Sequence, residues 1–347
     1  MDGLRGIAIL CVLAVNCGLP FFRGGFIGVD LFFVLSGFLI TALLTEEWEN
    51  SGTISLRRFY RRRALRLLPA LVVLLLACCL YAACVQSPEK ARTTYRETIW
   101  VLFYFANWML AAEQAVGSLD HAWSLSVEEQ FYLVWPAVLC GLLVRGIRRP
   151  WIILLVVSLA AAAAVWRAFL WSHGTHYLRL YYGSDTRADA LSAGCLLGLL
   201  FCWKLIPTTR TWRETLRVAA WIAILFLAAI GFLVPHDSPL LYRGGFTLIA
   251  LGAAALILQS VAVPESAIPR GLSWPLLVWI GRISYSLYIW HWPVFQILRA
   301  ERLAALGWSP ALALVLRLAA VFGAACLSYY LVERPFLRLK RRLEESG

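Results

Sequence analysis

Long apolar runs are the feature that most constrains how this chain of 347 residues can fold. A helix needs about 20 mostly apolar residues to cross a bilayer, and several runs approach that length. The sequence is 61% hydrophobic with a mean hydropathy of +0.72, whereas a soluble domain is nearer half apolar. We therefore expect an all-α polytopic membrane protein, built as one membrane domain over residues 1–347 with no soluble domain appended. The expected spans, about ten in number, are residues 7–22, 26–44, 67–85, 124–144, 151–172, 188–203, 217–234, 244–262, 274–296 and 309–332.

Four basic segments set the predicted orientation, because short cytoplasmic loops carry an excess of Lys and Arg. They are residues 45–66, 145–149 and 204–216 and the tail around Arg341. All four lie inside the cell only if the shorter apolar piece 98–112 does not cross the membrane. We therefore expect residues 98–112 to be re-entrant or interfacial. The chain is then a multi-pass protein of the inner (plasma) membrane with both termini cytoplasmic.

The net charge of +12 does not indicate nucleic-acid binding, because the arginines gather in short loops and no basic soluble module is expected. The nine cysteines lie in or beside apolar runs without the CxxC spacing of a metal site. We expect them to be buried free thiols that pack like small hydrophobes, and we expect no metal. The first apolar run has no small-residue cleavage site, so no signal peptide is predicted.

Polar groups inside predicted spans are costly, so each needs a function or a specific partner. Arg5 and Asn16 are eleven positions apart, close to three helical turns, and should lie on one side of the first helix about 16 Å apart. The alternative for Arg5 is a snorkelling anchor. Asp30, in the second span, either serves the site or hydrogen-bonds a neighbouring helix. Ser36 and Gly37 lie mid-span, where small residues permit close helix packing, and a direct catalytic role is the alternative for Ser36.

Residues 120–136 open an apolar helix with several ionisable groups, including His121, Glu128 and Glu129. Acids near a helix N-terminus are favoured by its dipole, and Asp120 or Ser126 would cap the helix. A carboxylate close to a histidine can instead act as a base or fix the tautomer of the imidazole. Both interpretations stay open, and His121 and Glu128 are candidate catalytic residues.

Two further segments carry polar residues near the outer ends of predicted spans. In residues 182–190, Arg187 and Asp189 either pair with each other or, with Asp185, hydrogen-bond a sugar or an acyl carbonyl. His291 lies between two tryptophans, where an interfacial aromatic belt explains the tryptophans better than the histidine.

The basic segment from Arg57 to Arg66 has two interpretations. It sets the topology and contacts anionic lipid headgroups, or it binds the phosphates of a nucleotide-bearing ligand, since arginine matches phosphate geometry with paired hydrogen bonds. Glu333 and Arg334 close the last span, and we expect a structural ion pair at the cytoplasmic surface.

Together these motifs resemble the membrane acyltransferase-3 family, of the type that acylates O-antigen or exopolysaccharide. The likeness runs from Asp2 to Phe336. The matching stretches are Asp2-Gly3-Leu4-Arg5-Gly6 with residues 25–41, Trp123-Ser124-Leu125-Ser126-Val127-Glu128-Glu129-Gln130-Phe131-Tyr132, Asp185-Thr186-Arg187-Ala188-Asp189, residues 281–293, and Glu333-Arg334-Pro335-Phe336.

The resemblance implies an integral membrane O-acyltransferase. The donor would be cytoplasmic acyl-CoA, most simply acetyl-CoA. The acceptor would be a sugar hydroxyl of a cell-surface glycan or glycolipid, and the protein would also contact membrane lipids. The implied roles are catalysis for Asn16, His121, Glu128 and His291, donor binding for Arg5, Arg61, Arg63 and Arg66, and acceptor binding for Asp30, Asp185, Arg187 and Asp189.

One position departs from the family pattern. The family pairs its arginine with a histidine in the first helix, and Asn16 stands at that position. Asparagine is not a base, although it can hydrogen-bond a carbonyl or an oxyanion, and losing a general base costs about 10² to 10⁴ in rate. The chain is therefore disabled or slowed, or His121 or His291 has taken over the role, or Asn16 orients a substrate that another group activates. The alternative functions are a catalytically inactive binder of sugar or lipid, or a small-molecule transporter.

Overall fold

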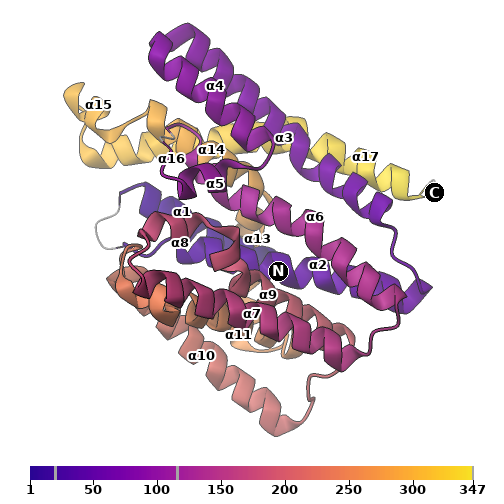
Figure 1. Ribbon diagram of the computed structural model, residues 1–347. Coiled ribbons are helices and arrows are strands. Elements are labelled where there is room, and N and C mark those ends of the chain that lie inside the picture. The colour runs from indigo at the N-terminus through magenta and orange to yellow at the C-terminus, as the bar shows by residue number, and fades with distance from the viewer. Residues whose placement is uncertain (19–21, 115–116, 346–347) are drawn as a thin grey trace. The chain divides into compact units, whose positions relative to one another are not determined.

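The computed structural model describes residues 1–18, 22–114 and 117–345, with residues 340–345 described by their backbone alone. Every regular element in this part of the chain is helical (Figure 1). The helices group into two compact units, one comprising residues 1–54, 111–113 and 127–282, and the other residues 55–110, 114–126 and 283–347.

The first unit contains helices from both halves of the chain. Helix α2 packs on α9, α7 packs on α9, α1 packs on α13, and α10 packs on α11. Helix α6 enters this unit at Val127. The elements of the first unit are α1 (Asp2–Asn16), α2 (Ile27–Ser51), α6 (Trp123–Val144), α7 (Arg149–Ser172), α8 (Tyr177–Tyr182), α9 (Ser184–Cys202), α10 (Arg210–Leu233), the π-helical turn η2 (Leu241–Gly245), α11 (Phe246–Ala262), α12 (Ala267–Leu272) and α13 (Pro275–Arg282).

Glycines set the close approach of α2 and α9. A Cβ atom added at Gly37 would collide with the backbone of Leu191, and one added at Gly194 would collide with the backbone of Val34. Small residues allow helix backbones to approach in this way inside membranes. The close packing expected around Ser36 and Gly37 is therefore confirmed.

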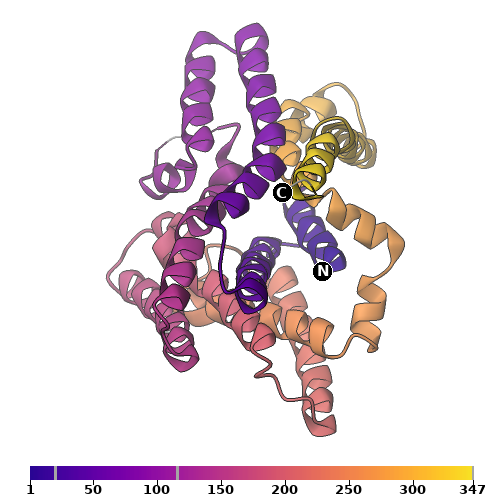
Figure 2. The ribbon, with the colours of Figure 1, turned by 90° about the vertical axis from the view of Figure 1, so that its right-hand side faces the viewer.

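In the second unit, helices α3 and α4 form a hairpin, and Figure 2 shows them side by side. Helix α14 packs on α16, and α17 packs on α3. The elements of the second unit are α3 (Leu56–Val85), α4 (Pro88–Leu102), α5 (Ala106–Ala111), the 3₁₀ turn η1 (Asp120–Ala122), α14 (Ser284–Ile297), α15 (Ala300–Ala305), α16 (Pro310–Ser328), the π-helical turn η3 (Tyr329–Glu333) and α17 (Arg334–Glu345).

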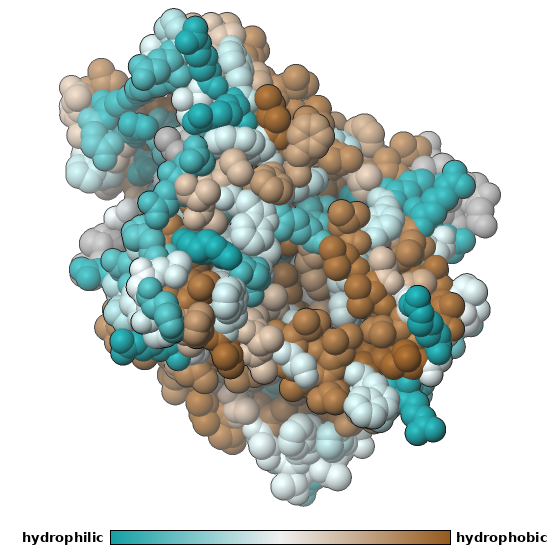
Figure 3. All heavy atoms as spheres, in the orientation of Figure 1, coloured by the Kyte–Doolittle hydropathy of each residue, from teal (hydrophilic) through white to brown (hydrophobic). Residues whose placement is uncertain are grey.

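Much of the exposed surface is apolar, as expected for side chains that face lipid. On α7, Leu154 is 50% exposed and Val165 is 68% exposed, and on α10 Leu225 is 69% exposed. Hydrophobic residues gather in Figure 3 over the region where Figure 1 draws α7. Within the described residues, seven helices are long and apolar enough to cross a membrane. The predicted all-α polytopic membrane fold is confirmed.

The expected count of ten spans stays a prediction. The three expected spans outside those seven fall on α1, which has 15 residues, on α9, and on α13 and α14. Residues 274–296 do not form one helix, because Ile283 separates α13 from α14. All nine cysteines lie within the described residues and are free thiols, as expected. The expected burial holds for Cys78 and Cys195, whereas six are half-buried and Cys84 is exposed.

The predicted loop 45–66 is wrong in its length. Helix α2 continues to Ser51 and α3 begins at Leu56, so the basic residues 57–66 are helical. The cause is local, because the Ser55 hydroxyl accepts a hydrogen bond from the Arg58 backbone N–H and caps the helix. Arginine and leucine then extend the helix as good helix formers.

The apolar piece 98–112 is not one continuous helix. Helix α4 ends at Leu102, and Tyr104 has a φ of 54°, in the left-handed region that breaks a right-handed helix. Helix α5 then has 6 residues. The re-entrant or interfacial location of this piece stays a prediction.

Accessibility of single cysteines tests that location. We expect Glu89→Cys and Ser118→Cys, on the two sides of residues 98–112, to react with a membrane-impermeant maleimide added outside intact cells, in a background without the native cysteines. Arg58→Cys, in the predicted cytoplasmic segment, should react only after permeabilisation. Labelling of Glu89→Cys and Ser118→Cys from opposite faces would show that the piece crosses the membrane.

Candidate active site

Two buried histidines face each other in the second unit. The sequence has five histidines, and His173, His176 and His236 are exposed, whereas His121 is 8% exposed and His291 is fully buried. The rings of His121 and His291 lie edge to face with centroids 5.2 Å apart. The structure thus brings together two candidates that are 170 positions apart in the sequence. We call them the histidine pair.

Backbone carbonyls fix the tautomer of each ring, because a carbonyl only accepts hydrogen bonds. Nε2 of His121 donates to the carbonyl of Ile289 at 3.1 Å, and Nδ1 of His291 donates to the carbonyl of Tyr288 at 2.5 Å. The remaining nitrogens, His121 Nδ1 and His291 Nε2, are buried and have no hydrogen-bond partner within the described residues. Each therefore presents a lone pair that can accept a proton.

Tyr288 holds the histidine pair in place. Its hydroxyl donates to the backbone carbonyl of His121 at 2.7 Å and lies 2.5 Å from the hydroxyl of Ser124. The Tyr288 ring lies 5.8 Å from the His121 ring and 5.4 Å from the His291 ring. Tyr288 and Ser124 were not predicted as site residues, although both belong to the motifs that carry the histidines.

Glu97 supports the segment that leads into His121. Its carboxylate accepts backbone hydrogen bonds from Gly117, from Ser118 at 3.0 Å and from Leu119 at 3.2 Å. Burial raises the pKa of Glu97, and these three N–H groups oppose that shift. Sequence reasoning missed Glu97, because it lies outside every expected span. Only the structure shows that it is 1% exposed and bonded to the segment before His121.

Glu128 lies in the first unit and links α6 to α2. The Ser36 hydroxyl donates to Glu128 Oε1 at 2.6 Å and accepts from the Tyr132 hydroxyl at 2.7 Å. Ser126 donates to the Ala122 carbonyl, and α6 begins at Trp123, so Ser126 does not cap the helix. The suggested action of Glu128 beside His121 stays a prediction.

Four charged residues form a buried cluster in the first unit, which we call the charge cluster: Asp30, Arg167, Arg187 and Asp189. Arg187 Nη2 donates to Asp30 Oδ1 at 2.6 Å, and both side chains are 1% exposed. Arg167 donates to the two oxygens of Asp189 at 3.0 and 2.7 Å. Arg187 and Asp189 therefore pair with partners on other helices, rather than with each other as one interpretation suggested.

The charge cluster retains unused hydrogen-bonding capacity. Asp30 Oδ2 and Arg187 Nη1 are buried and have no hydrogen-bond partner in the part of the chain that the structure describes. The Arg187 guanidinium also lies 3.8 Å from the centre of the Phe246 ring. The helix-to-helix bond expected as one alternative for Asp30 is found, and contact of Asp30 or Arg187 with an acceptor stays a prediction.

Arg167 is the residue of the charge cluster that sequence reasoning missed. It also donates to the Thr186 carbonyl at 2.6 Å and to the Thr247 hydroxyl at 2.7 Å. A lone arginine inside the apolar run 151–172 was the available signal, because an ionisable group in a span requires a partner.

The other predicted site residues have these positions. Asn16 is half-buried near the end of α1, and its amide donates to the Val12 carbonyl at 2.8 Å. Arg5 is half-buried on the same helix. Asp185 pairs with Arg179 at 2.7 Å, and this pair is partly exposed.

The donor-binding candidates Arg61, Arg63 and Arg66 lie on the first turns of α3, in the second unit. Arg61 is exposed, whereas Arg63 and Arg66 are half-buried. The expected surface location of Glu333 is wrong, because Glu333 is 4% exposed and accepts a hydrogen bond from Ser286. A π-helical turn carries Glu333 into the helix packing instead.

Comparison with known proteins shows which family the chain belongs to. The family described as an acyltransferase domain matches residues 1–333. The chain is 35% identical to the peptidoglycan O-acetyltransferase OatA of Listeria monocytogenes, over 96% of this chain and 55% of that protein. It is 34% identical to a putative peptidoglycan O-acetyltransferase of Bacillus subtilis, over 96% of this chain and 54% of that protein.

A putative O-acetyltransferase of Staphylococcus aureus is 32% identical, over 97% of this chain and 56% of that protein. The chain thus spans about half the length of the curated relatives it matches. No solved structure matches the chain.

The charge cluster and the partly exposed pair Asp185–Arg179 offer a matched test of buried and less buried charges. Asp30→Ala leaves Arg187 buried without its partner, and we expect a loss of roughly 3–5 kcal/mol of stability. Asp185→Ala removes a partly exposed pair and should cost at most about 1 kcal/mol. Thermal unfolding of the detergent-purified protein measures both. Equal midpoints for the two variants would contradict a stabilising role of the charge cluster.

Proposed function

The chain belongs to the acyltransferase-3 family, and on that premise we propose that it is an integral membrane O-acetyltransferase. It moves an acetyl group from acetyl-CoA on the cytoplasmic side to a sugar hydroxyl of a cell-surface glycan, with peptidoglycan as the first acceptor to test. The family match over residues 1–333 and the names of the relatives support this reaction class. The main structural observation in support of a catalytic site is the histidine pair.

The transfer requires a group that removes the proton of the acceptor hydroxyl. The acceptor oxygen forms a bond with the acyl carbon, the carbon–sulfur bond of the thioester breaks, and the sulfur leaves with a proton. His121 Nδ1 and His291 Nε2 are buried lone pairs in rings of fixed tautomer. We assign proton removal to His121, with His291 as the second ring that faces it. A positioned base of this kind contributes about 10² to 10⁴ in rate.

The arginines of α3 are the proposed donor-binding residues, and Arg5 of α1 is a separate candidate for the same role. Arg61, Arg63 and Arg66 lie within two turns of α3, and guanidinium groups suit the phosphates of coenzyme A. The positive-inside bias favours a cytoplasmic location for them and for Arg5. Asn16 contributes an amide that can hydrogen-bond a carbonyl or an oxyanion, but it cannot take a proton.

Replacement of His121 tests the proposal. In an acetyl-CoA consumption assay with peptidoglycan fragments as acceptors, we expect His121→Asn to lower the rate by about 10² to 10⁴, because the amide keeps hydrogen bonding but is not a base. His173→Asn removes an exposed histidine and should leave the rate unchanged. Transfer at the original rate by His121→Asn would remove the histidine pair from the mechanism.

Replacement of Asn16 tests whether a base is missing from the first helix. We expect Asn16→His to raise the rate by about two to four powers of ten and to change acetyl-CoA affinity little. The double variant Asn16→His/His121→Asn should keep the increase in rate if the histidine at position 16 acts without His121. Robust transfer by the chain as written, with no gain from Asn16→His, would mean that the proton is taken elsewhere. Binding of acceptor without transfer in every variant would identify a sugar-binding protein instead.

A further inference from the structure

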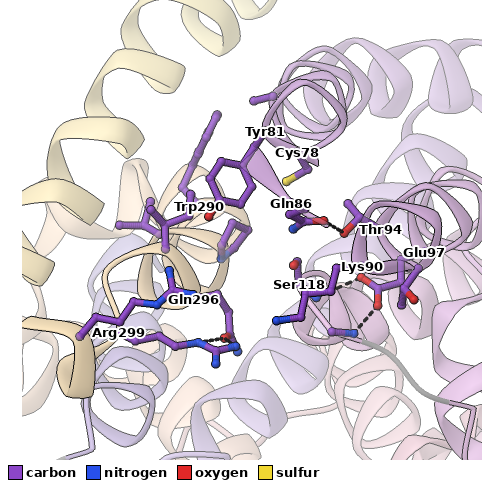
Figure 4. A pocket seen from close by; sticks show the side chains of 17 residues that line it. Cys78, Tyr81, Gln86, Lys90, Thr94, Glu97, Ser118, Trp290, Gln296 and Arg299 are labelled. Atoms are coloured by element: carbon purple, nitrogen blue, oxygen red, sulfur yellow. Dashed lines mark hydrogen bonds between the residues drawn. The ribbon is translucent and has the colours of Figure 1, made fainter. Parts of the chain in front are cut away.

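A cavity of about 290 Å³ lies within the second unit. It is lined by the C-terminal part of α3, by α4, by residues 117–118, and by residues of α14 and α15 (Figure 4). The volume is close to the lower end of the range of about 300–1,000 Å³ that small-molecule sites occupy. The proposed roles of the donor arginines and of Asn16 do not use this cavity.

The cavity adjoins both segments that carry the histidine pair. Trp290 lines it and directly precedes His291, and Ser118 lines it three residues before His121. Glu97 holds residues 117–119 through their backbone N–H groups, so this wall has a defined position. A ligand in the cavity would therefore lie next to the two chain segments that hold the proposed base.

The lining combines flat aromatic faces with hydrogen-bonding groups. Tyr81 and Trp290 supply rings, and Gln86, Gln296 and Ser118 supply amides and a hydroxyl. The indole Nε1 of Trp290 is buried and has no hydrogen-bond partner within the described residues. Rings pack against the C–H faces of a sugar, and amides donate to and accept from its hydroxyls.

The charge of the lining is the specific feature. Lys90, Arg299 and Arg302 are cationic, and all three are exposed side chains that line the cavity. Arg299 is held by two hydrogen bonds to Gln296 Oε1, at 3.0 and 2.7 Å. The one acid in the lining, Glu97, is engaged by the backbone of residues 117–119 and is 1% exposed. The cavity is therefore positive on balance.

We propose that this cavity is an acceptor subsite for an acidic sugar, whose carboxylate contacts Lys90 and Arg302 while its ring packs on Tyr81 and Trp290. This inference rests on the proposed function, because it names the acceptor class of that site. The headgroup of phosphatidylglycerol shares the charge but has no ring to use the aromatic faces and the two glutamines. The acidic sugar uses every kind of group in the lining.

Binding without donor tests the subsite independently of turnover. The full chain in neutral phosphatidylcholine nanodiscs is titrated with an oligosaccharide that ends in glucuronic acid, and with the methyl ester of the same oligosaccharide. We expect the acid to bind more tightly than the ester. The double variant Lys90→Gln/Arg302→Gln should weaken binding of the acid by roughly three- to tenfold, as fits exposed charge pairs, and leave the ester unchanged. Added salt should weaken binding of the acid alone.

The control variant is Arg92→Gln, which removes one charge from an exposed position of α4 outside the cavity lining. Unchanged binding by this variant supports a local effect. Equal binding of acid and ester by the original chain overturns the proposal. So does displacement of the acid by phosphatidylglycerol vesicles at matched salt, which would identify a lipid headgroup site.

Acetyl transfer to both oligosaccharides separates this inference from the proposed function. Transfer to the two at equal efficiency, with equal binding, leaves the function standing and overturns the subsite. Selective binding of the acid, lost in the double variant, supports the subsite even where neither compound is acetylated, and then the proposed function fails alone.

Discussion

The paired charges Asp30, Arg167, Arg187 and Asp189 are the interaction on which the first unit depends. They join α2, α7 and α9, and Thr247 of α11 donates to Asp189 at 2.7 Å, so four helices meet at one polar centre. Inside a bilayer such groups are tolerated only with partners, because water is not available to solvate them. The cluster therefore specifies which helices are neighbours. Hydrophobic contact alone would not do so, since lipid chains are as apolar as leucine.

Close backbone contact makes that polar centre possible. Gly37 and Gly194 let α2 and α9 approach until a Cβ atom would no longer fit, and this brings Asp30 of α2 to within hydrogen-bond distance of Arg187 on α9. Ser36, the neighbour of Gly37 on α2, donates to Glu128 of α6. Small residues and buried charges thus act together. The glycines set the separation of the helices, and the charges then fix their register.

Sequence patterns predicted the fold class and named both buried histidines and three of the four residues of the charge cluster as candidates, because apolar runs and local motifs are visible in the chain itself. They did not predict partners. Asp30 and Arg187 are 157 positions apart, and His121 and Tyr288 are 167 apart, so only the folded arrangement pairs them. Helix ends were also missed where one local group decides them, as the Ser55 cap does for α3. Arg167 was missed because its role depends on Asp189, on another helix.

The chemistry of the site then turns on which side chain can accept a proton. An amide such as Asn16 has no lone pair of useful basicity, and its amide N–H already bonds the Val12 carbonyl. The imidazole rings of the histidine pair differ from this amide, because each has a basic nitrogen. Each ring gives one N–H to a backbone carbonyl, and the opposite nitrogen must then carry the lone pair. Backbone carbonyls cannot titrate or reorient freely, so they fix this state without a carboxylate partner. The hydrogen bond from Ser36 to Glu128 joins α2 to α6, and an action of Glu128 beside His121 stays a prediction.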